Sequence, residues 1–221
     1  YGDVRGHFLL QSNRGGANKS NHLDLQLGLK NSKARFHPQL VPRTLSDNLL
    51  AWMDTAIKSA ALGDVGVFYS GGFTKKSPRS LQIFVDVEQG HLQFDKNWPA
   101  VKQLDANLLI DNSRLFAHVN KASMYQGDNF TGELKWNDSA DKRLTINVSG
   151  FAPANSVLRY VRESRLNNSA GDAINQISAK GNVAIKVDLD LLLATVARAT
   201  PDARSSEYEV EVAFKNNALS F

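Results

Sequence analysis

"LDANLLIDNSRLFAHV", residues 104–119, contains two short runs in which apolar side chains occupy every second position. Leu104, Ala106, Leu108 and Ile110 form the first run, and Leu115, Ala117 and Val119 form the second. A period of two is typical of a β-strand, whose side chains point alternately to the two faces of a sheet. The turn signal Asp111-Asn112-Ser113 between the runs is short enough for a tight hairpin. This stretch therefore predicts an antiparallel hairpin with one apolar face and one wet face.

The same alternation recurs through most of the chain. It is found in residues 23–29, 81–87, 92–94, 130–136, 144–148, 183–191 and 208–214. Turn signals separate these runs at Gln89-Gly90, at residues 126–129 and 137–139, and at Lys180-Gly181-Asn182. The pattern predicts a mainly β protein built as an antiparallel meander.

Three segments have helical spacing instead. Residues 46–62 have apolar side chains at positions 49, 50, 53, 57 and 60 and end at Gly63. A second helix is expected from Pro153 or Ala154 to Glu163, and a third short one around Ala173, Ile174 and Ile177. Their apolar surface is too small to cover about ten strands, so two sheet faces must meet or one face must stay open for something else.

The overall composition and charge restrict the functions that the chain can have. The chain has 221 residues, a net charge of +4 and no cysteine, which excludes disulfides and thiolate chemistry. Its lysines and arginines are scattered, so no nucleic-acid partner is expected. No apolar run approaches the roughly 20 residues of a membrane span. We expect one segment, residues 1–221, of a longer protein, with any membrane anchor outside it and the softest internal break near 165–171.

Motifs for catalysis are weak. No Gly-x-Ser-x-Gly elbow is present, and no two histidines have the i, i+4 spacing of a helical metal site. Asp86 and Glu88 share a strand face, as do Asp188 and Asp190, but two carboxylates in each place are too few for acid/base chemistry or calcium. The sequence therefore predicts no enzyme, no metal site and no cofactor.

One set of stretches carries a family resemblance. These are "RTLSDNLLAWMDTAI" with "ALGDVGVFYSG", then "LQIFVDVEQGHLQFDKNWPAVKQLDANLLIDNSRLFAHVNKASMYQG", then "LTINVSGFAPANSVLRYVRES". From about residue 43 to residue 193 the chain resembles the YhdP branch of the AsmA-like proteins of Gram-negative envelopes. The middle stretch, with two strands, Trp-Pro and a strand-turn-strand closing in Gly, is the most specific part.

The resemblance implies a bridge-like lipid carrier. Such proteins are long curved antiparallel sheets, hydrophobic inside and polar outside, anchored in the inner membrane and reaching across the periplasm. The expected fold is thus a curved β-groove with two or three short helices packed at its edge or end. The implied cargo is phospholipid moving between inner and outer membrane, and the implied protein partners are the remaining segments of the same long chain. Membrane contact would then occur only through parts absent from this segment, and no catalytic residues come with the resemblance.

The physics of lipid transfer fits such a groove. Each methylene taken out of water is worth about 0.8 kcal/mol, so a sixteen-carbon acyl chain exposed in the periplasm would cost on the order of 12 kcal/mol. Ten strands spaced about 4.8 Å apart would extend a trough by roughly 50 Å. The residues expected to line it are Leu81, Ile83, Val85, Val87, Leu92, Phe94, Leu104, Leu108, Ile110, Leu115, Val119, Phe130, Leu134, Trp136, Leu144, Ile146, Val148, Val183, Ile185, Val187 and Leu189. Leu23, Leu25, Leu27 and Leu29 are expected to face the same interior, where they contact either lipid or the underside of the first predicted helix.

Alternation alone leaves other interpretations open. A β-sandwich whose own side chains fill its interior shows the same pattern and needs no ligand. A structural envelope module could hold partners by strand addition at an exposed sheet edge. An enzyme acting on an envelope polymer would require convergent carboxylates in a cleft.

Overall fold

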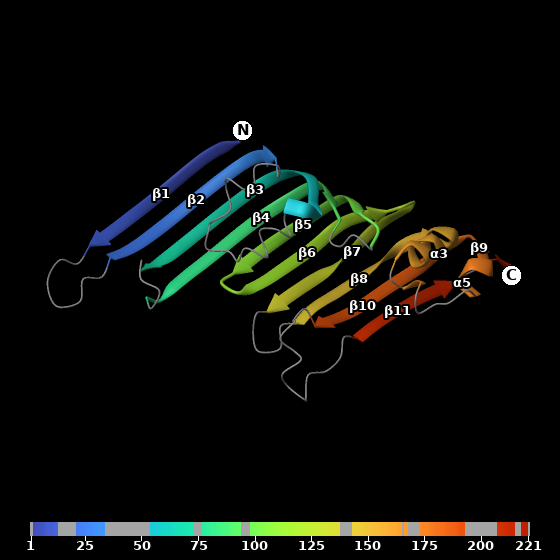
Figure 1. Cartoon of the computed structure of the whole chain (residues 1–221). Helices are drawn as coiled ribbons and strands as arrows, with labels where there is room; N and C mark the ends of the chain where they lie inside the picture. Colours follow the sequence, from blue (N-terminus) through green and yellow to red (C-terminus); the bar gives the residue numbers. More distant parts are fainter. Residues whose placement is uncertain are drawn as a thin grey trace, which may run out of the picture.

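Ten strands form one open antiparallel sheet in which the order in space follows the order along the chain (Figure 1). The computed structural model describes residues 2–12, 21–33, 54–72, 77–93, 98–137, 143–164, 166–167, 173–192, 207–214 and 218–220. The strands of the sheet are β1 (Asp3–Ser12), β2 (Asn21–Lys33), β3 (Ile57–Gly72), β4 (Arg79–Leu92), β5 (Val101–Asp111), β6 (Arg114–Met124), β7 (Gly127–Asn137), β8 (Arg143–Pro153), β10 (Asn182–Leu192) and β11 (Glu207–Phe214).

The sheet is the predicted meander, and the fold class predicted from the sequence is confirmed. After β8 the chain leaves the sheet to form the helices α3 (Ala154–Glu163) and α5 (Ala173–Gln176), then returns as β10, which pairs antiparallel with β8. The short strands β9 (Ser178–Lys180) and β12 (Ala218–Ser220) pair in a separate sheet. Gly181, with φ of 95°, makes the predicted turn at 180–182, but that turn joins two different sheets and is not a hairpin.

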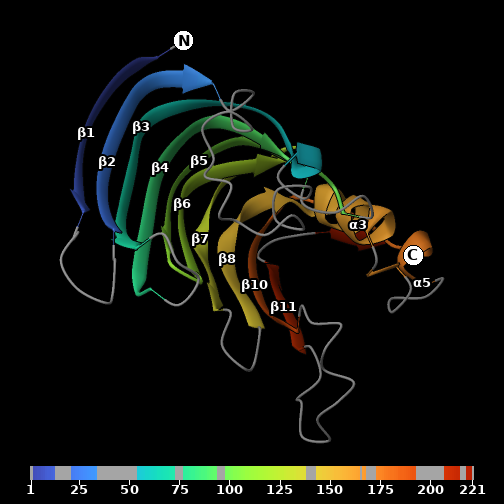
Figure 2. The same ribbon diagram turned by 60° about the vertical axis from the view of Figure 1, so that its left-hand side comes forward.

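A line of irregular pairings crosses the sheet and bends its strands. Register shifts occur between Leu62 and Val65 in β3, and in β4 to β7 beside Gln89, Gln103, Ala122 and Asn129. Gln89, Gln103 and Asn129 have positive φ angles of 51°, 48° and 58°. Such bulges bend a strand and increase its twist, and the strands curve as arcs in Figure 2.

Gln89-Gly90 was predicted as a turn between two strands, and that prediction is wrong. Both residues lie inside β4, where the extra residue moves the apolar set from positions 85 and 87 to positions 90 and 92. The left-handed backbone of Gln89 is supported by its N–H, which donates to Asp105 Oδ1 at 2.9 Å. The change of the apolar positions from odd to even numbers thus marks a bulge here and not the end of a strand.

The helix predictions have mixed outcomes. The second is confirmed, since α3 begins after Pro153 and ends at Glu163. The third is confirmed in part, because α5 stops before Ile177. In the first, residues 54–56 are helical but Ile57 already begins β3, where it pairs with Leu92. The predicted helical extension over 57–62 is therefore wrong, and residues 46–53 lie outside the described part of the chain.

Helix α3 packs against the apolar face of the last strands. Ala154 of α3, Ala179 of β9 and Val183 of β10 form a buried cluster, with Val157, Leu158, Ile185 and Val212 against it. Arg162 ties the helix to the following segment by donating to the carbonyl oxygens of Ile174 and Ile177, each at 2.7 Å from Nη2. Figure 2 shows α3 on the concave side of the sheet, so the apolar face is the concave one. None of the helices in the described residues has the length and hydropathy of a membrane-spanning segment.

Candidate functional site

The register of the ten strands joins their apolar positions into one continuous face. Each residue in the central row pairs with the next across the sheet, from β1 to β10, with Tyr208 of β11 after it. The row is Val4, Leu29, Val65, Val85, Leu108, Ala117, Leu134, Ile146 and Leu189. Parallel rows lie on either side of it. We call this surface the apolar face.

The register places nearly all of the predicted lining positions on the apolar face. Leu92 and Phe130 lie beside bulges, and both are on the apolar face. Leu92 pairs with Val101. The Phe130 ring lies against Gly150, which pairs with Ile185 of the apolar face. Phe94 lies outside the described residues. The remaining predicted positions are paired with one another or with apolar neighbours: Leu81, Ile83, Val85, Val87, Leu104, Leu108, Ile110, Leu115, Val119, Leu134, Trp136, Leu144, Ile146, Val148, Val183, Ile185, Val187 and Leu189.

The apolar face is only partly covered by the described residues. Val183, 1% exposed beneath α3, is the largest fully buried side chain among them. Elsewhere on the face most side chains are half-buried, and Leu27, one of the four leucines predicted to face the interior from residues 23–29, is 40% exposed. The described strands form an open sheet, so the self-filled β-sandwich is wrong for this part of the chain. Val183 itself contacts α3 and is closed to any ligand.

Polar side chains occupy the opposite, convex face. Asn107 donates to Asp86 at 3.1 Å, Asn147 donates to Asp188 at 2.7 Å, and Arg143 Nε donates to Asp190 at 2.6 Å. Hydrogen bonds from Lys186 and Asn147 lower the pKa of Asp188. The two predicted carboxylate pairs sit on β4 and β10, with β5 to β8 between them, so they do not converge. Among the described residues no group of three or more His, Asp or Glu side chains could hold a metal.

An apolar patch interrupts the polar face. Phe84, Leu109 and Phe116 are directly paired across β4, β5 and β6, and they are 40%, 39% and 38% exposed. They border a shallow hollow of about 270 Å³ that also contacts Lys135 and Glu133. None of the three was predicted from the sequence as a functional residue, although Phe84 and Phe116 stand at polar positions of their alternating runs.

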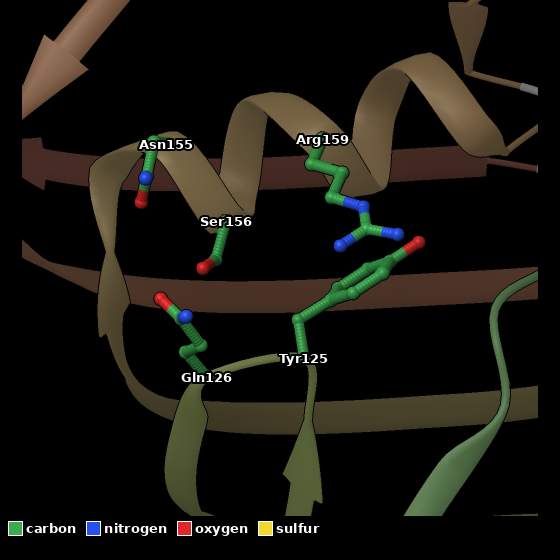
Figure 3. A pocket seen from close by; sticks show the side chains of 5 residues that line it. All are labelled: Tyr125, Gln126, Asn155, Ser156 and Arg159. Carbon is green, nitrogen blue, oxygen red and sulfur yellow. The ribbon is translucent and has the colours of Figure 1, made fainter.

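A second hollow, of about 280 Å³, lies where α3 meets the turn between β6 and β7. It is lined by Tyr125 and Gln126 from the turn and by Asn155, Ser156 and Arg159 from the helix, and we call it the rim pocket. Figure 3 shows these side chains pointing toward one another from the two elements. None of the five was predicted from the sequence, because the two segments lie about thirty residues apart and share no motif.

Ionic and aromatic contacts fix one wall of the rim pocket. The Arg159 guanidinium lies 4.7 Å from the centre of the Tyr125 ring, and Arg159 Nε donates to Glu163 Oε1 at 2.7 Å. The Tyr125 hydroxyl donates to Glu163 Oε2 at 2.5 Å, and this bond is the largest cause of the lowered pKa of Glu163. Burial, followed by the same bond, raises the pKa of Tyr125 to about 12. The Tyr160 ring, 5.9 Å from that of Trp98, supports Tyr125 edge-on.

Comparison with known proteins identifies the family. The family model described as "YhdP protein" matches residues 3–221. The chain belongs to the YhdP family. A curated relative, the intermembrane phospholipid transporter YhdP of Escherichia coli K12, is 21% identical over 191 residues, which cover 84% of this chain and 14% of the relative. No solved structure matches the chain.

Membership in the YhdP family confirms the resemblance inferred from the sequence. The match extends beyond residues 43–193, where the resemblance was recognised, to almost the whole chain. The chain spans only 14% of its E. coli relative, whose name is that of a lipid transporter and not of an enzyme.

Proposed function

We propose that this chain is one segment of a periplasmic phospholipid conduit, in which the apolar face shields acyl chains between the inner and outer membranes. The observation that carries the proposal is a concave apolar surface that continues across ten strands and is left half-exposed by the described residues. A soluble protein gains by covering such a surface. Acyl chains would cover it and lose contact with water, at about 0.8 kcal/mol per methylene.

The shape of the face favours sliding over docking. Its central row runs perpendicular to the strands from Val4 to Leu189, with only apolar side chains along it. Each step along the row exchanges one aliphatic contact for a similar one, so no single site holds the chain strongly. Polar head groups would stay on the open side in water. Catalysis is not part of this proposal, and neither is a bound cofactor.

The sheet edges support continuation into further segments. All ten residues of β1 are exposed, and β1 and β11 are the outer strands of the described sheet. Unpaired edge strands are templates for added strands. We propose that further strands of the same long chain pair there, consistent with the E. coli relative being much longer than this chain. Residues 1–221 would then form one stretch of an elongated groove.

Photo-crosslinking in cells tests the proposal. A benzophenone side chain at Leu108 or Ile146 faces the apolar side, whereas one at Asn107 or Asn147 faces the polar side. Purification after illumination, followed by mass spectrometry, should find phospholipid attached at the first two positions and not at the second two. Equal labelling of both faces, or no lipid at either inward position, would contradict the proposed function.

A further inference from the structure

The rim pocket gathers polar side chains from α3 and from the turn between β6 and β7. Ser156 is 7% exposed and lines the pocket, yet its hydroxyl has no hydrogen-bond partner among the described residues. Figure 3 shows this hydroxyl directed from α3 toward the turn, where it can donate to a ligand in the hollow. Asn155 and Gln126 add side-chain amides on either side, and Figure 3 shows both directed into the same space.

The first turn of α3 adds positive character to this space. Pro153 occupies the N-cap position and makes no side-chain capping bond, and the first turn carries no acidic residue. The Ala154 N–H donates to the carbonyl oxygen of Gly181 at 2.8 Å, and the next two residues of the first turn, Asn155 and Ser156, both line the pocket. Free N–H groups at a helix start attract anions, most strongly oxyanions such as phosphate.

Arg159, one turn further along, adds a guanidinium group whose charge is shared with the paired Glu163 carboxylate. Its Nε is bound to Glu163, but its two terminal nitrogens have no acceptor among the described residues. Figure 3 shows the guanidinium above the Tyr125 ring, with one terminal nitrogen on the side where Ser156 lies. Glu163 does not line the pocket and its carboxylate already accepts from Tyr125 and Arg159. None of the five residues that line the hollow carries a carboxylate.

The position of the pocket points to a lipid as the source of the anion. Gln126 is followed by Gly127, where an added Cβ would lie 2.8 Å from both the Phe130 ring and Ala152. Phe130 belongs to the apolar face, so the hollow opens at the rim of that face. At about 280 Å³ it is smaller than the pockets that enclose whole drug-sized ligands. It suits a head group whose acyl chains lie elsewhere.

We propose that the rim pocket binds the phosphate group of a glycerophospholipid while its acyl chains rest on the neighbouring apolar face. This inference rests on the proposed function and adds to it a binding site for the lipid head group beside the apolar face, which we call the head-group station. The Ser156 hydroxyl, the N–H groups of the first turn of α3 and the Arg159 guanidinium donate to the phosphate oxygens. Gln126 and Asn155 complete the hydrogen bonds around the head group.

Calorimetric titration of the 221-residue chain tests the station. The probes are dihexanoylphosphatidylglycerol below its micelle-forming concentration, glycerophosphoglycerol, which is the same head group without acyl chains, and inorganic phosphate. Arg159→Gln should weaken binding of the short-chain lipid about tenfold and Ser156→Ala about threefold, because each removes a hydrogen bond to a charged group. The matched variants Arg114→Gln and Ser149→Ala, at exposed strand positions, should leave binding unchanged.

The outcomes separate the sources of the anion and the two proposals. Tighter binding of the short-chain lipid than of glycerophosphoglycerol, lost in the two pocket variants, supports a lipid station. Equal binding of all three probes would overturn it in favour of a free-phosphate site. Wild-type lipid affinity in Arg159→Gln and Ser156→Ala, with melting curves showing folded protein, would overturn it altogether. Crosslinks at Leu108 and Ile146 would in that case still uphold the proposed function.

Discussion

A single carboxylate placed on the apolar face should block lipid locally. Leu134 lies in the middle of the face, between Ala117 of β6 and Ile146 of β8, and is half-buried. Leu134→Asp would therefore put a charge among aliphatic side chains with no cation opposite it. In water the charge is tolerated, so the chain should stay folded and lose only about 1 kcal/mol of stability from the missing apolar contact.

An acyl chain arriving at the same place would have to desolvate the carboxylate. A charge facing lipid costs about 2 to 3 kcal/mol, and 1.4 kcal/mol corresponds to a factor of ten in occupancy. With the lower value, lipid contact beside position 134 should fall about thirtyfold. The assay is the yield of phospholipid crosslinked to a benzophenone at Ile146, the direct cross-strand neighbour of Leu134.

The matched control carries the same charge on the opposite face of the same strand. Thr131 is exposed and pairs with Ser149 on the polar side, so Thr131→Asp should change the yield at Ile146 less than twofold. Melting curves of both variants verify that they are folded. An undiminished yield in Leu134→Asp would show that acyl chains do not pass over this position, and the reasoning from the apolar face would fail.

Three further predictions concern the fold that supports this face. Gln89→Val should lower the free energy of unfolding in urea by about 1 to 2 kcal/mol, because a β-branched side chain is strained at φ of 51°, while Gln89→Gly should cost no stability; equal effects would refute a strained bulge. Val183→Ala should cost about 2 to 3 kcal/mol and the half-exposed Val187→Ala about 1 kcal/mol, measured in the same way, and the reverse order would contradict packing of α3 on Val183. Tyr125 has a pKa raised from 10.0 to about 12, so its contribution to stability is fully present below pH 10 and lost toward pH 12. Tyr125→Phe should flatten that alkaline loss in pH-dependent melting, and an unchanged slope would argue against the raised pKa.

The alternation of side chains was sufficient to predict the sheet. Runs such as Leu81 to Val87 and Leu144 to Val148 place every second residue on one face, and the observed register joins those faces without exception in the central row. Pro153 followed by Val157, Leu158 and Val161 was likewise sufficient to place α3. In these segments the local pattern and the tertiary packing favour the same secondary structure, so the sequence alone predicts it.

Bulges were not predictable from the same pattern. At Gln89 the apolar residues change from odd to even positions, which looks like the end of one strand and the start of another. Only the pairing partners on β5, Asp105 and Leu104, distinguish a bulge from a turn. The helix prediction at Ile57 and Ala60 was wrong for a related reason. A spacing of three between apolar residues fits a helix, and it also fits a strand that contains an irregularity. The rim pocket depends on contacts between distant segments, so it carried no local signal at all.

The agreement between chain order and strand order has a consequence for how such proteins vary in size. Because each strand in the described sheet bonds only to its neighbours, with α3, α5 and β9 between β8 and β10, a hairpin could be duplicated or removed without disturbing pairings further away. Each added hairpin would lengthen the molecule by about 10 Å. Gene duplication would thus change the length of such a sheet one pair of strands at a time.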